Sequence, residues 1–136
     1  MAALAGLSTP EILALAMRDE EADAQFFRQI ATRLRDGFPG TAAMFDQLAL
    51  EEQGHKNRLL ALFRRRFGPE LPDLERPELR GLGRRRLPAP SLADLRPEAA
   101  RQQAQRMEQA AAEFYRRAAQ APRDVEARQL LGDLAL

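Results

Sequence analysis

The chain contains no cysteine, which excludes disulfides, thiolate nucleophiles and cysteine-bound zinc or electron-transfer modules. It also has no excess of one charge, because 21 basic residues face 20 acidic ones and the net charge is +1. Such a balance gives no general attraction to nucleic acid, so we expect no nucleic-acid partner. No run of about 18 apolar residues occurs, and we therefore expect no membrane span in this chain.

The 136 residues suffice for one domain with a real core, and we expect a single domain over 1–136. The N-terminal stretch MAALAGLSTPEILALAM is apolar, but it has no basic region, and Glu11 interrupts its apolar run, unlike a signal peptide. Ser8 and Glu11 have the spacing of a capping box, and Pro10 suits a first helical turn. We predict a short tail entering a helix, and a cytoplasmic location.

Apolar residues recur at helical spacing in four segments, and no segment shows sustained strand alternation. The predicted helices cover 10–36, 41–67, 97–120 and 124–136. The connections GFPG (37–40) and APRD (121–124) are short, so each joins two antiparallel neighbours. Residues 68–97 hold six of the nine prolines and must form a long crossover. The prediction is an all-α, ferritin-like up-down four-helix bundle with one long crossover and a truncated fourth helix.

Steps of three and four residues define one inward seam on each of the first three helices. The seams consist of Leu13, Met17, Glu20, Ala24, Phe27, Ala31 and Leu34; of Phe45, Leu48, Glu52, His55, Leu59 and Leu62; and of Ala104, Glu108, Ala111, Tyr115 and Ala118. Each seam contains one glutamate. A coincidence of this kind on three separate helices is not explained by surface charge.

Carboxylates that face a bundle core need a counter-charge or must be neutralised by protonation. The three seams contain no lysine or arginine, so the sequence predicts a metal ion held between the helices by Glu20, Glu52, His55 and Glu108. His55 lies three residues after Glu52 and can reach the same ion. Glu51 is an alternative, but it falls roughly 70° from the centre of the apolar stripe, against roughly 30° for Glu52.

Simpler interpretations compete with this one. A lone histidine on an apolar face is more often a core residue than a ligand, and Tyr115 is more readily explained as core packing than as a redox neighbour of the site. The arginine triplets at 64–66 and 84–86 could bind an anionic partner. Because acidic residues balance them elsewhere, we favour solvated surface for both triplets.

The two halves of the chain resemble each other. EEADAQFFRQIA (20–31) aligns with EQAAAEFYRRAA (108–119), which pairs Glu20 with Glu108, and FDQLAL (45–50) aligns with LGDLAL (131–136). The repeat predicts a pseudo-symmetric site with a second Glu-x-x-His at positions 138 and 141. The sequence ends at Leu136, so we expect either a fragment that lacks the C-terminal part of the fourth helix or a variant with a half-built site.

These residues resemble the rubrerythrin-type, ferritin-like di-iron carboxylate proteins. The resemblance is carried by LAMRDEEADAQFF, FDQLALEEQGH, MEQAAAEFYRRAA and RQLLGDLAL. The crossover, RFGPELPDLERPELRGLGRRRLPAPSLADL, is most similar to that of bacterial membrane-bound ferritins, in which a vacuolar-iron-transporter-like membrane domain follows. A membrane domain after this chain in its parent protein would fit that likeness.

The resemblance implies two irons, with manganese or zinc as substitutes. Glu20, Glu52 and His55 would hold one iron, and Glu108 would hold the second together with fourth-helix ligands that this chain lacks. The implied activity is of ferroxidase or peroxidase type, with Fe(II) and O2 or H2O2 as partners, in iron homeostasis or peroxide defence. The alternative is a non-catalytic helical interaction module. Both allow a homodimer, because a short fourth helix leaves apolar surface uncovered.

Overall fold

The computed structural model describes residues 4–84 and 91–136. Its α-helices are α1 (Thr9–Leu34), α2 (Pro39–Phe67), α3 (Pro97–Ala118) and α4 (Val125–Leu134), with two short 3-10 helices, η1 (Leu4–Gly6) and η2 (Pro77–Leu79). No strand occurs among the described residues. The prediction of an all-α, ferritin-like bundle is confirmed, and each α-helix lies close to its predicted range.

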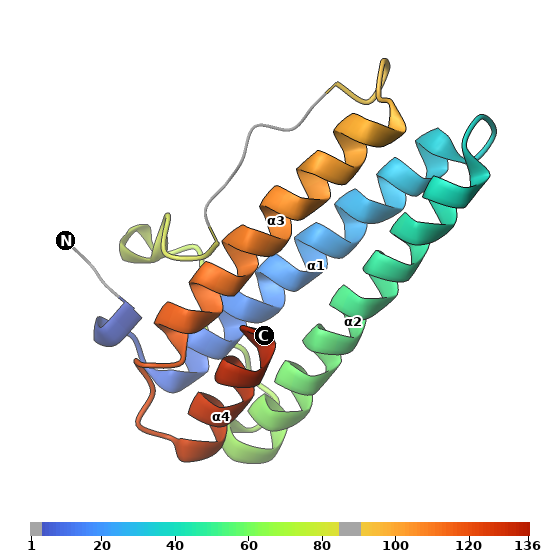
Figure 1. The fold of residues 1–136 in the computed structure, drawn as a ribbon. Helices are drawn as coiled ribbons and strands as arrows, with labels where there is room; N and C mark the ends of the chain where they lie inside the picture. Colours follow the sequence, from blue (N-terminus) through green and yellow to red (C-terminus); the bar gives the residue numbers. More distant parts are fainter. Residues whose placement is uncertain (1–3, 85–90) are drawn as a thin grey trace.

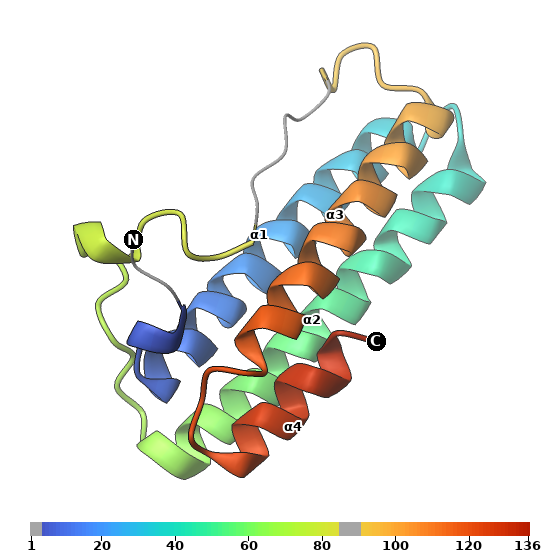
Figure 2. The same ribbon diagram turned by 60° about the vertical axis from the view of Figure 1, so that its left-hand side comes forward.

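The three long helices lie side by side, and α4 runs along only one half of their length (Figures 1 and 2). The most extensive packing joins α1 to α2. With 10 residues, α4 is less than half as long as α3, which has 22. One half of the bundle therefore contains four helices and the other half three.

Local signals fix where the helices begin and end. The Ser8 hydroxyl accepts a hydrogen bond from the backbone N–H of Glu11 at 3.2 Å, and the Ser8 N–H donates to the Glu11 carboxylate at 2.9 Å. The predicted capping box is therefore present at the start of α1. Asp124 caps α4 in a similar way by accepting from the N–H of Ala127. At the end of α2, Gly68 adopts a φ of 88°, which favours glycine.

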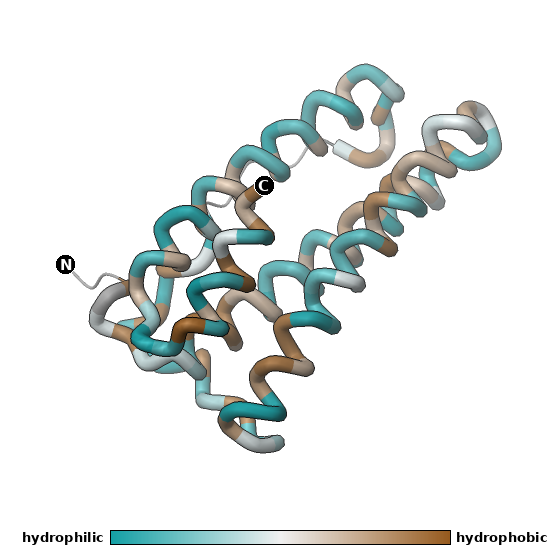
Figure 3. Tube along the Cα trace, turned by 60° about the horizontal axis from the view of Figure 1, so that its bottom comes forward, coloured by the Kyte–Doolittle hydropathy of each residue, from teal (hydrophilic) through white to brown (hydrophobic). Residues whose placement is uncertain are grey.

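The buried apolar side chains form two clusters along the bundle axis. The first lies in the four-helix half and includes Leu13, Leu59 and Tyr115. The second lies in the three-helix half and includes Phe27 and Phe45, whose ring centroids are 5.8 Å apart. Hydrophobic residues (brown) are interspersed with hydrophilic ones (teal) in the helical part of the chain (Figure 3), as expected of amphipathic helices around a shared core. The inward glutamate of α1 lies between the two clusters.

The first described part of the crossover, residues 68–84, lies on the outside of the bundle (Figure 1). Leu79, at the end of η2, is fully buried, and Leu82 packs against the first cluster. Residues 79–82 are therefore fixed to the core. None of the described helices combines the length and the apolar character that a bilayer crossing requires.

Candidate metal centre

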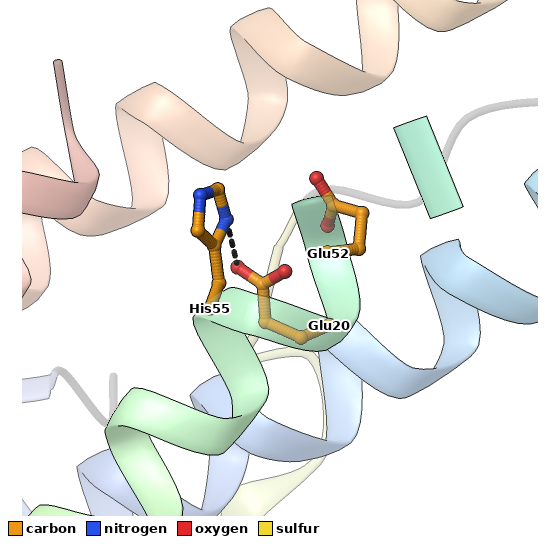
Figure 4. A group of neighbouring side chains, drawn as sticks. All are labelled: Glu20, Glu52 and His55. Atoms are coloured by element: carbon orange, nitrogen blue, oxygen red, sulfur yellow. Dashed lines mark ion pairs between the residues drawn. The ribbon is translucent and has the colours of Figure 1, made fainter. Parts of the chain in front are cut away.

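Three of the predicted ligands come together between α1 and α2. Glu20 projects from α1, and Glu52 and His55 project from α2 one turn apart (Figure 4). Each residue offers one ligand atom, and these atoms lie within 4.8 Å of one another. Their side chains are graded in exposure, from 0% for Glu20 to 12% for Glu52 and 35% for His55. Glu51 is exposed, in agreement with the choice of Glu52 as the inward carboxylate.

The two carboxylate oxygens of Glu20 have different environments. Oε1 accepts hydrogen bonds from the Tyr115 hydroxyl and from the Arg84 guanidinium, and His55 Nδ1 lies 3.5 Å from it. Among the described residues, no donor reaches the buried Oε2. A buried oxygen without a partner is costly, so Oε2 has capacity for a proton or a cation.

The positive charge at this site comes from the crossover. The side chain of Arg84 is only 6% exposed and makes ion pairs with Glu20, Asp23 and Glu52. Its Nη1 lies 3.3 Å from Glu52 Oε2, and its Nη2 lies 3.1 Å from the Tyr115 oxygen. The guanidinium carbon is 5.2 Å from the centre of the Tyr115 ring. One buried cation thus contacts acidic side chains from both α1 and α2.

The interpretation of both arginine triplets as solvated surface is therefore wrong for Arg84. The helical seams contain no counter-charge. The positive charge beside the buried carboxylates comes instead from a loop that lies far from them in sequence. Two glycines close to the triplet, Gly81 and Gly83, are the signal that the loop could approach the helices closely. The interpretation does fit 64–66, which are exposed, while Arg85 and Arg86 lie outside the described residues.

Glu20 and Glu52 titrate as a pair. Burial would raise the pKa of Glu20, but contact with His55 and Glu52, the charge of Arg84 and the Tyr115 hydroxyl together lower its pKa to about 2. Burial and the hydrogen bond with Glu20 raise the pKa of Glu52 to about 9. The metal-free pair therefore keeps one proton near neutral pH, on Glu52.

Asp23 and Asp19 complete an acidic ridge on α1 that sequence reasoning missed. Asp23 lies one turn after Glu20, and burial raises its pKa to about 6 despite its ion pair with Arg84. Asp19 accepts a hydrogen bond from the backbone N–H of Arg84 at 2.8 Å. The spacing of one turn from Glu20 could have identified Asp23, but Asp19 contacts the crossover only because of the tertiary fold.

The structure does not bring Glu108 into the group. It is exposed, and burial together with the nearby negative charge of Glu51 raises its pKa. The prediction that Glu108 lies in the inward seam of α3 is therefore wrong. The physical reason is that no fourth helix covers this part of α3, because α4 runs along only the other half of the bundle (Figure 2). Tyr115, on the same predicted seam, is buried and hydrogen-bonded to Glu20.

The arrangement of Glu20, Glu52 and His55 fits a single metal ion. Bonds from an ion to oxygen and nitrogen ligands are about 2.0–2.2 Å long, so its ligands lie about 3–4 Å apart. The observed spacing is at most 4.8 Å, and small side-chain rotations would close the difference. Two carboxylates and an imidazole suit iron, manganese or zinc, and the unpaired Glu20 Oε2 supplies a further lone pair.

Comparison with known proteins agrees with this geometry. The family model described as Rubrerythrin matches residues 11–136, which is nearly the whole chain. No curated protein and no solved structure matched the chain. The family match covers all four α-helices, including the helices that carry Glu20, Glu52 and His55. The chain therefore belongs to the rubrerythrin family of ferritin-like proteins.

Proposed function

We propose that this protein binds iron through Glu20, Glu52 and His55 and oxidises Fe(II) with O2 or H2O2, in iron homeostasis or peroxide defence. The observation that carries the proposal is the convergence of two carboxylates and an imidazole from α1 and α2 on one point between the two core clusters. Bound iron would supply the one-electron step between Fe(II) and Fe(III) and a coordination position for the oxidant.

The protein's own residues prepare the site for that chemistry. Glu20 and Glu52 supply hard oxygen ligands and negative charge in a poorly solvated environment, which stabilises Fe(III) more than Fe(II). The Tyr115 hydroxyl holds Glu20 Oε1 in place through a hydrogen bond. His55 is the most exposed of the three ligands, so Fe(II) and the oxidant would approach from its side.

Under this proposal, Glu108 could contribute only to a second iron site. Its carboxylate would need further ligands, which the internal repeat predicts at positions 138 and 141. The exposed position of Glu108 beside Glu51 gives it no defined partner cation among the described residues. We therefore propose one well-formed iron site in this chain.

The first prediction concerns metal content. Protein loaded with Fe(II) under anaerobic conditions should bind about one equivalent, and Glu52→Ala and His55→Ala should each lower the affinity by more than about tenfold, because each removes a ligand. The matched control is Glu51→Ala, which removes the exposed neighbouring carboxylate. Metal analysis after gel filtration measures binding, and ferric absorbance after addition of O2 or H2O2 measures oxidation. Unchanged binding in both ligand variants would contradict the proposal.

A second function, a metal-free helical interaction module, is favoured by one specific observation. Arg84 already supplies a positive charge to the inward carboxylates, as an ion would. Large apolar side chains are also exposed on α2, including Met44 and Leu50. This function predicts a stable homodimer and no metal retained in any variant. The metal measurement separates the two proposals, because both functions allow a homodimer.

A further inference from the structure

Arg84 occupies the charge position that a metal ion would fill. Its guanidinium contacts Glu20 and Glu52, which are two of the three members of the candidate metal group. A divalent ion bound there would lie a few ångströms from this buried positive charge. Like charges in a poorly solvated environment repel strongly, so the guanidinium and the ion compete for the same carboxylates.

The guanidinium stays charged, and in its present position it pairs with Asp23 as well as with Glu20 and Glu52. Burial alone would lower the pKa of Arg84, but the surrounding acidic groups raise it above its ordinary value. The residue therefore cannot make room for an ion by losing its proton. It can make room only by moving its side chain.

Arg84 lies outside the helices, so its side chain can leave the site without the unfolding of any helix. It follows η2 and belongs to no helix, whereas Glu20, Glu52 and His55 lie well inside α1 and α2. Its backbone is held by one hydrogen bond to Asp19 and by the close approach of Gly83. A side chain at position 83 would overlap Asp19 Oδ2 and lie 2.7 Å from Arg18 Nη2, so these two side chains or the loop would have to shift.

We propose that Arg84 is an internal counter-cation that closes the site in the metal-free protein and must leave when an ion binds. This inference rests on the proposed function, that Glu20, Glu52 and His55 bind metal. Because the competent state requires Arg84 to be displaced, the apparent metal affinity is lowered by the fraction of molecules in which it is displaced. By the reciprocity of linked equilibria, bound metal must in turn expose Arg84.

The test uses arginine modification by phenylglyoxal, with mass spectrometry to locate the products, in metal-free protein and in protein with Co(II). The exposed Arg80 on the same crossover is the reference within the molecule. Without metal, Arg84 should react at least about tenfold more slowly than Arg80, and Co(II) should bring its rate close to that of Arg80. Continued protection of Arg84 in protein that has bound Co(II) would overturn the proposal.

Variants test the same idea through affinity. Arg84→Gln should bind Co(II) at least about tenfold more tightly than the wild-type chain, while Arg80→Gln should not differ from it. Weaker binding in Arg84→Gln would show that Arg84 supports the site instead of closing it, and equal binding in all variants would show no competition.

Failure of this inference can be told apart from failure of the proposed function. If Co(II) binds to no variant, including Arg84→Gln, the metal site itself is refuted, and with it the inference. If Co(II) binds and depends on Glu52 and His55 but not on Arg84, the metal site stands and only the role of Arg84 fails. Should Arg84→Gln not fold, the modification experiment on the wild-type chain still decides the question.

Discussion

At the scale of single residues, the ligands of the site could be predicted from the sequence, but the arginine that contacts them could not. Spacing alone identified Glu20, Glu52 and His55, because steps of three and four place them on inward faces of two helices. The same spacing gave the wrong environment for Glu108. Glu20 and Glu108 are equivalent in the internal repeat, yet one is fully buried and the other exposed, because burial depends on the helices that surround each position.

Arg84 could not be derived in this way. The partners of its side chain lie 31 to 64 residues away in sequence, and its own segment has no periodicity that would orient its side chain. An arginine in an irregular loop is exposed in most proteins. Only the three-dimensional packing of the crossover against α1 shows that this one is buried.

The shared proton of the metal-free pair gives a prediction at this scale. Glu52 is protonated in the folded protein below pH of about 9, but an ordinary glutamate ionises in the unfolded chain near pH 4.5. Between these values unfolding releases a proton, so the stability contributed by the protonated group falls as the pH rises. From about pH 5.5 to about pH 8, the metal-free protein should lose up to about 3 kcal/mol from this group.

Urea unfolding at the two pH values measures this loss. Glu52→Gln keeps the neutral hydrogen-bonding shape but cannot ionise, so its stability should fall less over the same interval. Glu51→Gln, which changes the exposed neighbour, should follow the wild type. Equal slopes for the wild-type chain and Glu52→Gln would mean that Glu52 is already ionised in the folded protein.

At the scale of secondary structure elements, the short α4 is the α-helix with the fewest buried side chains. It is held at its start by Asp124, which also pairs with Arg66 of α2 at 2.8 Å. A second pair joins Arg65 of α2 to Glu126. Exposed ion pairs of this kind contribute little to stability, so the attachment of α4 depends mainly on its buried side chains, Ala127 and Leu131.

We therefore predict that Leu131→Ala lowers the free energy of unfolding by about 2–4 kcal/mol, because it leaves a cavity in the first core cluster. Val125→Ala is the matched control on the same helix, since Val125 is 55% exposed, and it should change stability by less than about 0.5 kcal/mol. Chemical denaturation measures both. A loss below about 1 kcal/mol in Leu131→Ala would mean that α4 is detached in solution for much of the time.

At the scale of the whole molecule, the polar site separates the two hydrophobic clusters of the core. The number of helices, their order and the long crossover could all be predicted from apolar periodicity and the positions of proline and glycine. These features are local or follow from loop length. The division of the core into two clusters could not be predicted from the sequence, because it depends on how the polar side chains of separate helices line up along the bundle axis.

A bound ion would join the two halves of the core through α1 and α2. Metal at about a hundred times its dissociation constant should raise the free energy of unfolding by about 2.7 kcal/mol, because it binds the folded chain only. Thermal unfolding followed by circular dichroism, with and without Co(II), measures this gain. At the same ion concentration, His55→Ala should gain at most about 1.4 kcal/mol, because its affinity is at least about tenfold lower. A rise of equal size in His55→Ala would place the ion elsewhere.

The three ligands differ in exposure, so an ion that arrives from solvent would meet them in a fixed order. An arriving cation can first meet the imidazole of His55, which is 35% exposed, then Glu52 at 12%, and only last Glu20, which water does not reach. Each step exchanges more of the hydration shell for protein atoms, and the final one is the step at which Arg84 must give way. Loading from solvent would therefore proceed by stages. In the first stage the imidazole of His55 would hold the ion loosely, and in the last stage the carboxylate of Glu20 would complete its binding.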